Sequence, residues 1–337
     1  MKEIFPGIFL ITEKGAFGVI KPPLNIYIIA GEQGLIYDAG YGKRNAVKYL
    51  IKEINKIKTN YNNQNKDFNL VRIIPSHAHP DHFSGLKKIR DKLDVKVAIT
   101  QKMAEIVSDK LAFYKSFEDT HEDYFLIQKK RKKESIGIKL RRFITRTFYR
   151  RGYGVAYINN PDEIIEENIE FVINNDKWKV LHTPGHSIDH ISLYNEKKGI
   201  LLAGDNILRT KTTWLGPPGS NIQDYLNSLK KIHELPKLEI ILPSHGSHIE
   251  NPKERIEEII SHRNNRTQQV LDMINEFSDI GITLKDIIRN LYPKHSRFMH
   301  NVARGWVCLT LKMLEDEKLI RKEISRINRE YQFFPMM

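Results

Sequence analysis

Three histidines and an aspartate occupy a six-residue window that follows the apolar run Ile-Ile-Pro. These residues are His77, His79, Asp81 and His82. In an extended chain His77 and His79 project to the same side, so both imidazoles can bind one cation. Pro80 is well tolerated at the first position of a helix, and a helix starting there would direct Asp81 and His82 towards a second cation. The spacing indicates a metal site, and a histidine-rich surface loop is the weaker alternative.

Three more short motifs follow, each at the expected end of a strand. They contain His186 in Thr-Pro-Gly-His, Asp205 in Ala-Gly-Asp and His245 in Pro-Ser-His-Gly. Taken singly, each motif is more typical of a turn. Because they follow the histidine cluster in this order, we interpret them as parts of the same site. Imidazole and carboxylate groups suit zinc, and equally iron or manganese, and two such cations favour hydrolysis.

The four motifs in this order resemble those of the metallo-β-lactamase superfamily, over residues 5–250. The resemblance implies an α/β fold, the αββα sandwich, and hydrolysis by a hydroxide that bridges two divalent metal ions, with zinc as the expected metal. It also implies seven ligands, three for one metal, three for the second and one that bridges both: His77, His79 and His186; Asp81, His82 and His245; and Asp205. Asp81 and Asp205 are the predicted catalytic residues.

Three further polar residues lie close to these motifs. The resemblance implies that Asp38, at the end of Leu-Ile-Tyr, orients ligands, and a simple turn residue is the alternative. His182 and His190 flank His186, and they either support the ligands, face the substrate or make structural hydrogen bonds.

Two parts of the sequence point to different branches of the superfamily. Residues 182–191 resemble glyoxalase II and its relatives, which hydrolyse thioesters. Residues 261–271 and the tail after them resemble the mitochondrial β-lactamase-like endoribonuclease and its bacterial relatives, some of which act on single-stranded RNA. The tail departs from that group, because Thr310 stands where relatives usually carry His and Glu317-Lys318 replaces their Glu-Gly.

Three functions are therefore open. The first is a dinuclear metal hydrolase of an ester or thioester, either glyoxalase II-like or acyl-CoA-like, which the core motifs favour. The second is a metal-dependent endoribonuclease on single-stranded RNA, which the tail and the basic segment at residues 129–151 favour. The third is a nucleic-acid or membrane-binding protein with a vestigial site, and the intact set of seven ligands argues against it.

The elements that must position these residues follow a strand-rich layout that occurs twice. Both stretches together predict a catalytic domain over residues 1–250. β-Rich runs closed by turn residues predict strands at residues 8–12, 25–30, 35–38, 70–75, 95–100, 171–173, 178–182, 191–194, 199–203 and 240–243. Helices are expected at residues 44–57, from Pro80 onwards and at 223–234.

A helical insertion over residues 101–160 separates the two stretches. Its segment 129–151 holds eleven Lys or Arg residues against Glu134 alone, which accounts for ten of the thirteen net positive charges of the chain. Apolar residues at helical spacing make part of it a basic amphipathic helix: Ile136, Leu140, Phe143, Ile144 and Phe148. We expect an anionic small-molecule substrate or single-stranded RNA there, or a peripheral membrane contact. A solvated helix that packs on the sandwich is the alternative.

Residues 251–337 are predicted to form a linking helix and a small winged-helix-like domain. Helices are expected at 253–277, 283–291 and within 296–317, before a two-stranded tail at 319–334. Duplex DNA binding is not expected, because the last helix mixes basic and acidic residues. They are Arg297, Arg304, Lys312, Glu315, Asp316 and Glu317.

Composition sets the remaining limits. The 337 residues are 40% hydrophobic and 28% charged, which is typical of a globular protein. Cys308 is the single cysteine, so a disulfide framework and a cysteine zinc cluster are both excluded. The N-terminus lacks the apolar core of a signal peptide and no window approaches 18 apolar residues, so we expect a cytoplasmic protein. The sequence does not determine the oligomeric state.

Overall fold

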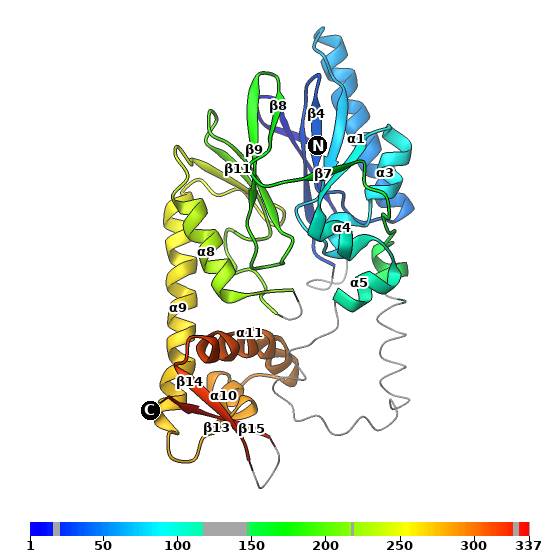
Figure 1. The fold of residues 1–337 in the computed structure, drawn as a ribbon. Coiled ribbons are helices and arrows are strands. Elements are labelled where there is room, and N and C mark those ends of the chain that lie inside the picture. The colour runs from blue at the N-terminus through cyan, green and yellow to red at the C-terminus, as the bar shows by residue number, and fades with distance from the viewer. Residues whose placement is uncertain (16–20, 117–146, 148, 217–218, 326–329, 337) are drawn as a thin grey trace.

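The computed structural model describes residues 1–337 apart from 16–20, 117–146, 148, 217–218, 326–329 and 337. Two β-sheets pack face to face, helices cover their outer faces, and a smaller C-terminal domain lies beyond one end of this sandwich (Figure 1). The architecture is the expected αββα sandwich.

The first sheet has seven strands in sequence order. They are β1 (Lys2–Phe5), β2 (Ile8–Glu13), β3 (Leu24–Ile29), β4 (Gly34–Tyr37), β5 (Leu70–Ile74), β6 (Lys96–Thr100) and β7 (Glu163–Ile165). The first four pair antiparallel, and β4 to β7 pair parallel. Parallel neighbours need crossover connections. Helix α1 (Arg44–Asn63) lies between β4 and β5, and α2 (Pro80–Phe83) and α3 (Leu86–Leu93) lie between β5 and β6. The edge strands β1 and β7 are not predicted by the sequence.

The second sheet has five strands in the order β12-β11-β10-β9-β8. They are β8 (Glu170–Ile173), β9 (Asp176–His182), β10 (Ile191–Asn195), β11 (Ile200–Gly204) and β12 (Ile240–Pro243). All pairs are antiparallel except β11 with β12, which are joined through α8 (Ile222–His233). Each predicted strand of the sandwich is present within two residues of its expected bounds.

A buried apolar layer joins the two sheets. Tyr27 and Tyr37 of the first sheet pack in one cluster with Trp178 of the second, and all three are at most 1% exposed. The Tyr37 hydroxyl donates to the carbonyl oxygen of Ile191 (2.9 Å), and the Tyr27 hydroxyl donates to that of Pro243 (2.7 Å). These bonds satisfy buried hydroxyl groups and fix the two sheets relative to each other.

The insertion begins with α4 (Gln101–Val107) and α5 (Lys110–Ser116) and ends with a π-helical turn, η2 (Tyr149–Tyr153). The expected basic amphipathic helix lies almost wholly outside the described residues. The expectation of helix to residue 160 is wrong for residues 154–160, which are not helical. There the Ile158 N–H donates to the carbonyl oxygen of Val107, so the chain returns to the sandwich in an irregular conformation.

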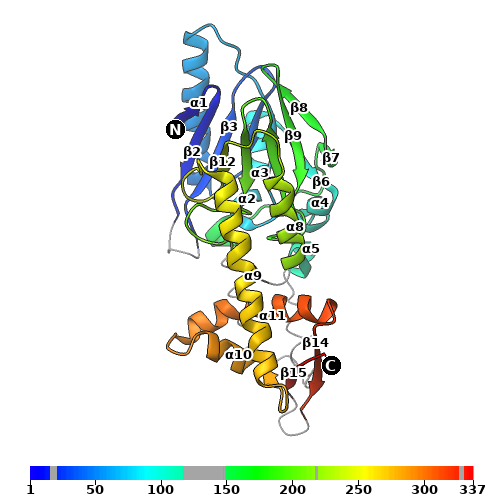
Figure 2. The same cartoon turned by 90° about the vertical axis from the view of Figure 1, so that its left-hand side faces the viewer.

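The helix α9 (Pro252–Glu276) connects the sandwich to the C-terminal domain (Figures 1 and 2). Ile256 and Ile259 pack in the core outside the second sheet, and Val270 and Ile274 pack in the core of the C-terminal domain. That domain contains β13 (Ile282–Thr283), α10 (Leu284–Leu291), α11 (Arg297–Asp316), β14 (Ile320–Ile324) and β15 (Tyr331–Pro335). The short strand β13 is an addition to the expected two-stranded tail. No described helix combines the length and the apolar character that crossing a membrane requires.

Candidate metal centre

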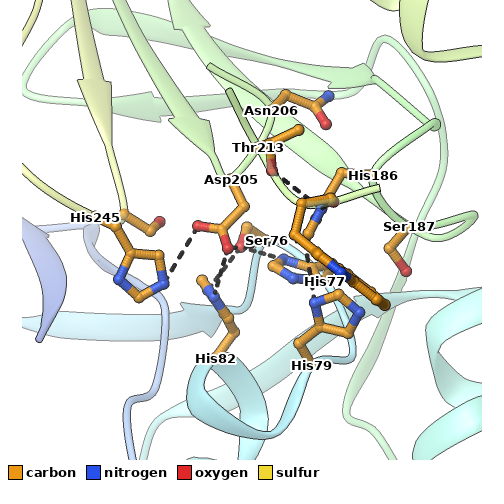
Figure 3. A network of polar contacts seen from close by, with 12 residues as sticks. Ser76, His77, His79, His82, His186, Ser187, Asp205, Asn206, Thr213 and His245 are labelled. Atoms are coloured by element: carbon orange, nitrogen blue, oxygen red, sulfur yellow. Dashed lines mark hydrogen bonds and ion pairs between the residues drawn. The ribbon is translucent and has the colours of Figure 1, made fainter. Parts of the chain in front are cut away.

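The structure brings all seven predicted ligands together, and Figure 3 shows six of them: His77, His79, His82, His186, Asp205 and His245. They lie in α2 and in the loops that follow β5, β9, β11 and β12. The ligand atoms fall into three groups, within each of which they lie at most 4.8 Å apart: His77, His79 and His186; His77, His82 and Asp205; and Asp81, His82 and His245.

Asp205 lies between the other ligands, where a bridging carboxylate is expected. Its Oδ2 is 3.5 Å from Nε2 of His82 and 3.7 Å from Nε2 of His186, and its Oδ1 is 3.5 Å from Nε2 of His245. On one side Nε2 of His186 is 3.0 Å from Nδ1 of His79. The arrangement could hold one cation on each side of Asp205.

Several of these polar atoms are buried without satisfying partners. Among the residues that the structure describes, Nε2 of His77, Nε2 of His82 and Oδ1 of Asp205 are buried and make no hydrogen bond. Leaving such an atom unsatisfied costs about 1–3 kcal/mol. Imidazole nitrogens and a carboxylate oxygen that converge in this way fit divalent cations such as zinc, iron or manganese.

The outward nitrogen of each of three histidines is held by a hydrogen bond. Nδ1 of His186 is 2.8 Å from the carbonyl oxygen of Trp214, and Nδ1 of His245 is 2.6 Å from that of Pro23. Nδ1 of His82 is 3.0 Å from Oδ2 of Asp38. A proton on each Nδ1 leaves Nε2 facing the centre, which is how proteins orient metal-binding imidazoles.

Asp38 is fully buried and supports several of these residues. Its Oδ1 accepts a hydrogen bond from the Ser76 N–H (2.7 Å), and its Oδ2 accepts one from the Ser244 hydroxyl (2.6 Å) in addition to the His82 contact. Its backbone is left-handed, with φ of 69°, which is typical of a turn, and its contact with His82 is the one that the ligand-orienting role requires. The turn places its carboxylate beneath the ligands.

The two histidines that flank His186 differ in their positions. His190 is buried, its Nε2 accepts a hydrogen bond from the Asp205 N–H (3.2 Å), and its Nδ1 is 2.9 Å from the Thr183 hydroxyl. It therefore positions the backbone of Asp205. His182 is not in any of the three groups of candidate ligands, and its carbonyl oxygen accepts a hydrogen bond from Lys231.

The charges of the metal-free site follow from burial and from neighbouring ligands. Burial and adjacent histidines lower the pKa of His79 to about 3, so this imidazole is neutral and able to bind a cation. Burial lowers the pKa of His82, but the carboxylates of Asp38 and Asp205 outweigh it and raise this pKa well above its usual range. The pKa of Asp81 is about 2: burial raises it, and His82 and His245 outweigh that effect. A cation must displace the His82 proton.

Asp189 is a buried residue of the site that is not among those predicted from the sequence. Its Oδ2 accepts a hydrogen bond from the Ala78 N–H (2.7 Å), between two predicted ligands, and its Oδ1 accepts one from the Ser187 hydroxyl. Burial raises the pKa of this carboxyl. The sequence does contain a signal for this residue: an acidic side chain lies directly before His190, in the same motif as the predicted ligand His186 and ahead of the apolar strand β10.

A cleft of about 710 Å³ opens beside His79. Its walls come from α4 and α5 of the insertion on one side and from residues 185–188, 214–216 and 219–221 on the other. The described part of the insertion therefore lines the approach to the site.

Comparisons with known proteins agree with this geometry. The family described as the metallo-beta-lactamase superfamily matches residues 22–245, which is more than half of the chain and includes all seven predicted ligands. A beta-lactamase domain protein from Burkholderia ambifaria has the same fold, with a TM-score of 0.75 at 18% identity, and the match covers 99% of this chain and 93% of that one. The shared fold therefore includes the C-terminal domain.

Three curated relatives are similar in sequence. A beta-lactamase-like protein 2 homolog from Drosophila melanogaster is 32% identical over 51% of this chain and 56% of its own, so this chain spans about half the length of that relative. A probable metallo-hydrolase from Bacillus subtilis is 23% identical over 80% of both chains. The atrochrysone carboxyl ACP thioesterase of Aspergillus fumigatus is 30% identical over 36% of this chain and 38% of its own.

Proposed function

The chain belongs to the metallo-beta-lactamase superfamily, and we propose that it is a metal-dependent hydrolase whose substrate is an ester, most simply a thioester. The observation that carries the hydrolytic part is the convergence of seven predicted ligand side chains beside an open cleft, with buried nitrogen and oxygen atoms that make no hydrogen bond. The thioester part is supported by the similarity to an acyl carrier protein thioesterase. The resemblance of residues 182–191 to glyoxalase II supports it as well.

The chain would hold one cation through His77, His79 and His186 and the other through Asp81, His82 and His245, with Asp205 between them. When bound, two divalent cations lower the pKa of water and polarise a carbonyl oxygen. The side chains around them supply orientation.

Three residues outside the ligand set keep the ligands in place. Asp38 holds Nδ1 of His82, Asp189 holds the backbone at Ala78, and His190 holds the backbone at Asp205. A thiolate is a good leaving group, because a thiol pKa is about 8.5. Cleavage of a thioester therefore does not require a separate side chain to protonate the leaving sulfur.

The test is turnover on a panel of thioesters and matched oxygen esters, before and after treatment with a chelator. We expect thioester hydrolysis that the chelator abolishes and that zinc, iron or manganese restores. Turnover that resists metal removal, or oxygen esters hydrolysed faster than matched thioesters, would contradict this proposal.

A second candidate, cleavage of single-stranded RNA, is favoured by a pocket of about 500 Å³ in the C-terminal domain. Lys285 and Arg289 of α10 and Arg297 and Arg304 of α11 line it, and Glu330 is the acidic residue of its described lining. The acidic residues of α11 lie at its opposite end, so the basic and acidic residues are separated along the helix. Such a basic surface suits a phosphodiester backbone.

The RNA candidate is tested with a labelled single-stranded oligonucleotide. Chelator-sensitive cleavage, weakened by Arg297→Gln and Arg304→Gln while thioester turnover is unchanged, would favour it. We continue to propose that duplex DNA is not a ligand. We also propose a cytoplasmic location. A further proposal is an anionic partner for segment 129–151, which lies almost wholly outside the described residues.

A further inference from the structure

Two large apolar side chains are exposed in the cleft beside the candidate metal centre. Ile188 is 54% exposed and Trp214 is 49% exposed, and both line the same cleft as His79. Single exposed apolar residues are common on protein surfaces. Two that face one cleft next to a reactive centre instead suggest a surface that binds an apolar group.

The position of Trp214 is fixed by contacts with the site. Its carbonyl oxygen lies 2.8 Å from Nδ1 of His186, so its backbone is tied to a predicted ligand. Its indole lies over Gly216, where an added Cβ would come within 2.2 Å of the ring. A residue with a side chain at position 216 would displace the indole, so the glycine is part of this arrangement.

Ile188 is held by its neighbours in the chain. Ser187 and Asp189 on either side of it are buried, and the Ser187 hydroxyl donates a hydrogen bond to the Asp189 carboxylate. Asp189 also holds the backbone at Ala78. The Ile188 side chain is thus presented to the cleft by a loop that the site itself anchors.

The wall of the cleft formed by α4 and α5 adds apolar side chains, and the described lining carries equal numbers of basic and acidic side chains. Ile106 of α4 and Ala112 of α5 face this cleft. The charged side chains of the described lining are two lysines and two carboxylates: Lys102, Lys115, Glu105 and Asp224. Lys102 and Glu105 form an ion pair at 3.3 Å. The described lining therefore carries no net charge that would select an anionic acyl group.

We propose that Trp214 and Ile188 bind the acyl group of the thioester and that this group is an apolar chain longer than acetyl. The proposal rests on the proposed function and names its substrate class. A cleft of about 710 Å³ is large enough for such a chain. Small hydroxylated acyl groups bury less apolar surface there and are poorer substrates.

The first experiment measures hydrolysis of acetyl, butyryl, hexanoyl and octanoyl pantetheine by the metal-loaded full chain. Each buried methylene contributes about 0.8 kcal/mol, or roughly fourfold, so kcat/KM should rise up to about fourfold per methylene until the cleft is filled. Trp214→Ala and Ile188→Ala should flatten this dependence on chain length.

Val172→Ala is the matched control. Val172 lies in β8, is 52% exposed and does not line the cleft, so its loss removes a similar exposed apolar surface elsewhere. This variant should keep the wild-type dependence on chain length. Thermal unfolding of each variant verifies folding, and Ile188→Ala decides the result if Trp214→Ala does not fold.

A second measurement does not depend on turnover. Calorimetry compares binding of S-octyl and S-methyl pantetheine thioethers, which cannot be hydrolysed. We expect the octyl compound to bind at least tenfold more tightly to the wild type and to Val172→Ala, and this preference to be lost in Ile188→Ala.

The two measurements separate the two proposals. Equal binding of both thioethers to the wild type, or an unchanged preference in both cleft variants, overturns the apolar acyl site. A preference for the octyl compound that Ile188→Ala removes supports the site even if no thioester is hydrolysed, and in that case only the proposed reaction fails.

Discussion

Oδ2 of Asp38 lies 3.0 Å from Nδ1 of His82, and neither side chain has any exposed surface. The same carboxylate also accepts hydrogen bonds from the Ser76 N–H and the Ser244 hydroxyl. It therefore connects the loop after β5, the helix α2 and the loop after β12. Because it accepts the proton on Nδ1, it directs Nε2 of His82 towards the other predicted ligands.

Asp38→Asn should weaken metal binding more than it disturbs the fold. The amide keeps the volume but removes the charge that holds the His82 imidazole. Losing such a supporting partner typically costs 10-fold to 100-fold in metal affinity. Competition with a chelator of known affinity measures the change. Unaltered affinity would show that Asp38 acts only as a turn residue.

The ligand set could be predicted from the sequence because its members sit in short motifs with fixed spacing. Four of the seven lie within six residues, and the others follow strand ends. Contacts across space could not be predicted in this way. The support of Ala78 by Asp189 joins residues 111 positions apart, and the carbonyl of Trp214 that holds His186 has no sequence signal.

The role of His182 stays a prediction. Its proximity to His186 in sequence suggested a role at the site. His182 is the last residue of β9, and its carbonyl oxygen accepts a hydrogen bond from Lys231 of α8. Side chains alternate between the two faces of a strand, so the His182 side chain shares the face of Trp178 and Val180, which pack between the two sheets. Its Nε2 is buried and makes no hydrogen bond.

Asp205→Asn should reduce kcat by more than about 100-fold, because it removes the charge of the predicted bridging ligand. Loss of a residue that only hydrogen-bonds to a metal ligand already reduces activity by up to about 100-fold. The Asp205 carboxylate lies within 3.7 Å of three predicted ligand nitrogens. Asp91→Asn is the control, since that carboxylate is 57% exposed on α3. Near-wild-type turnover with unchanged metal content would mean that Asp205 is not the bridge.

The purified chain should contain two divalent metal ions, because the predicted ligands His77, His79 and His186 form one group and Asp81, His82 and His245 form another. Elemental analysis after growth in metal-replete medium gives the number per chain. A metal ion that binds the folded protein but not the unfolded chain also raises the free energy of unfolding. The increase is about 2.7 kcal/mol when the free metal concentration is 100 times the dissociation constant. Metal removal should therefore lower Tm. A content of zero or one that zinc, iron and manganese all fail to raise would contradict the two-metal site.

Replacing Lys129–Lys133 by glutamine should raise KM for a CoA ester and leave KM for a small neutral thioester unchanged. These residues hold five of the positive charges of the basic segment, in a part of the insertion that the structure does not describe. Attraction of an anionic substrate is screened by salt, so the wild-type preference should also fall as salt rises. Equal effects on both substrates would favour the solvated-helix alternative.

Glu13→Gln should change how stability depends on pH. Burial raises the pKa of the Glu13 carboxyl to about 7, although the Tyr41 N–H donates to it at 2.9 Å. The folded state therefore holds a proton that the unfolded chain loses near pH 4.5, and stability falls as pH rises from about 4.5 to about 7. One pKa unit corresponds to about 1.4 kcal/mol, so the Glu13→Gln variant should have a free energy of unfolding up to about 3 kcal/mol above that of the wild type at pH values above 7. At pH 4 the two proteins should be equally stable.

Urea unfolding of the metal-free proteins at both pH values measures this difference. Glu32→Gln, at an exposed position, should match the wild type at both pH values, and an equal response of the two variants would refute the role of Glu13.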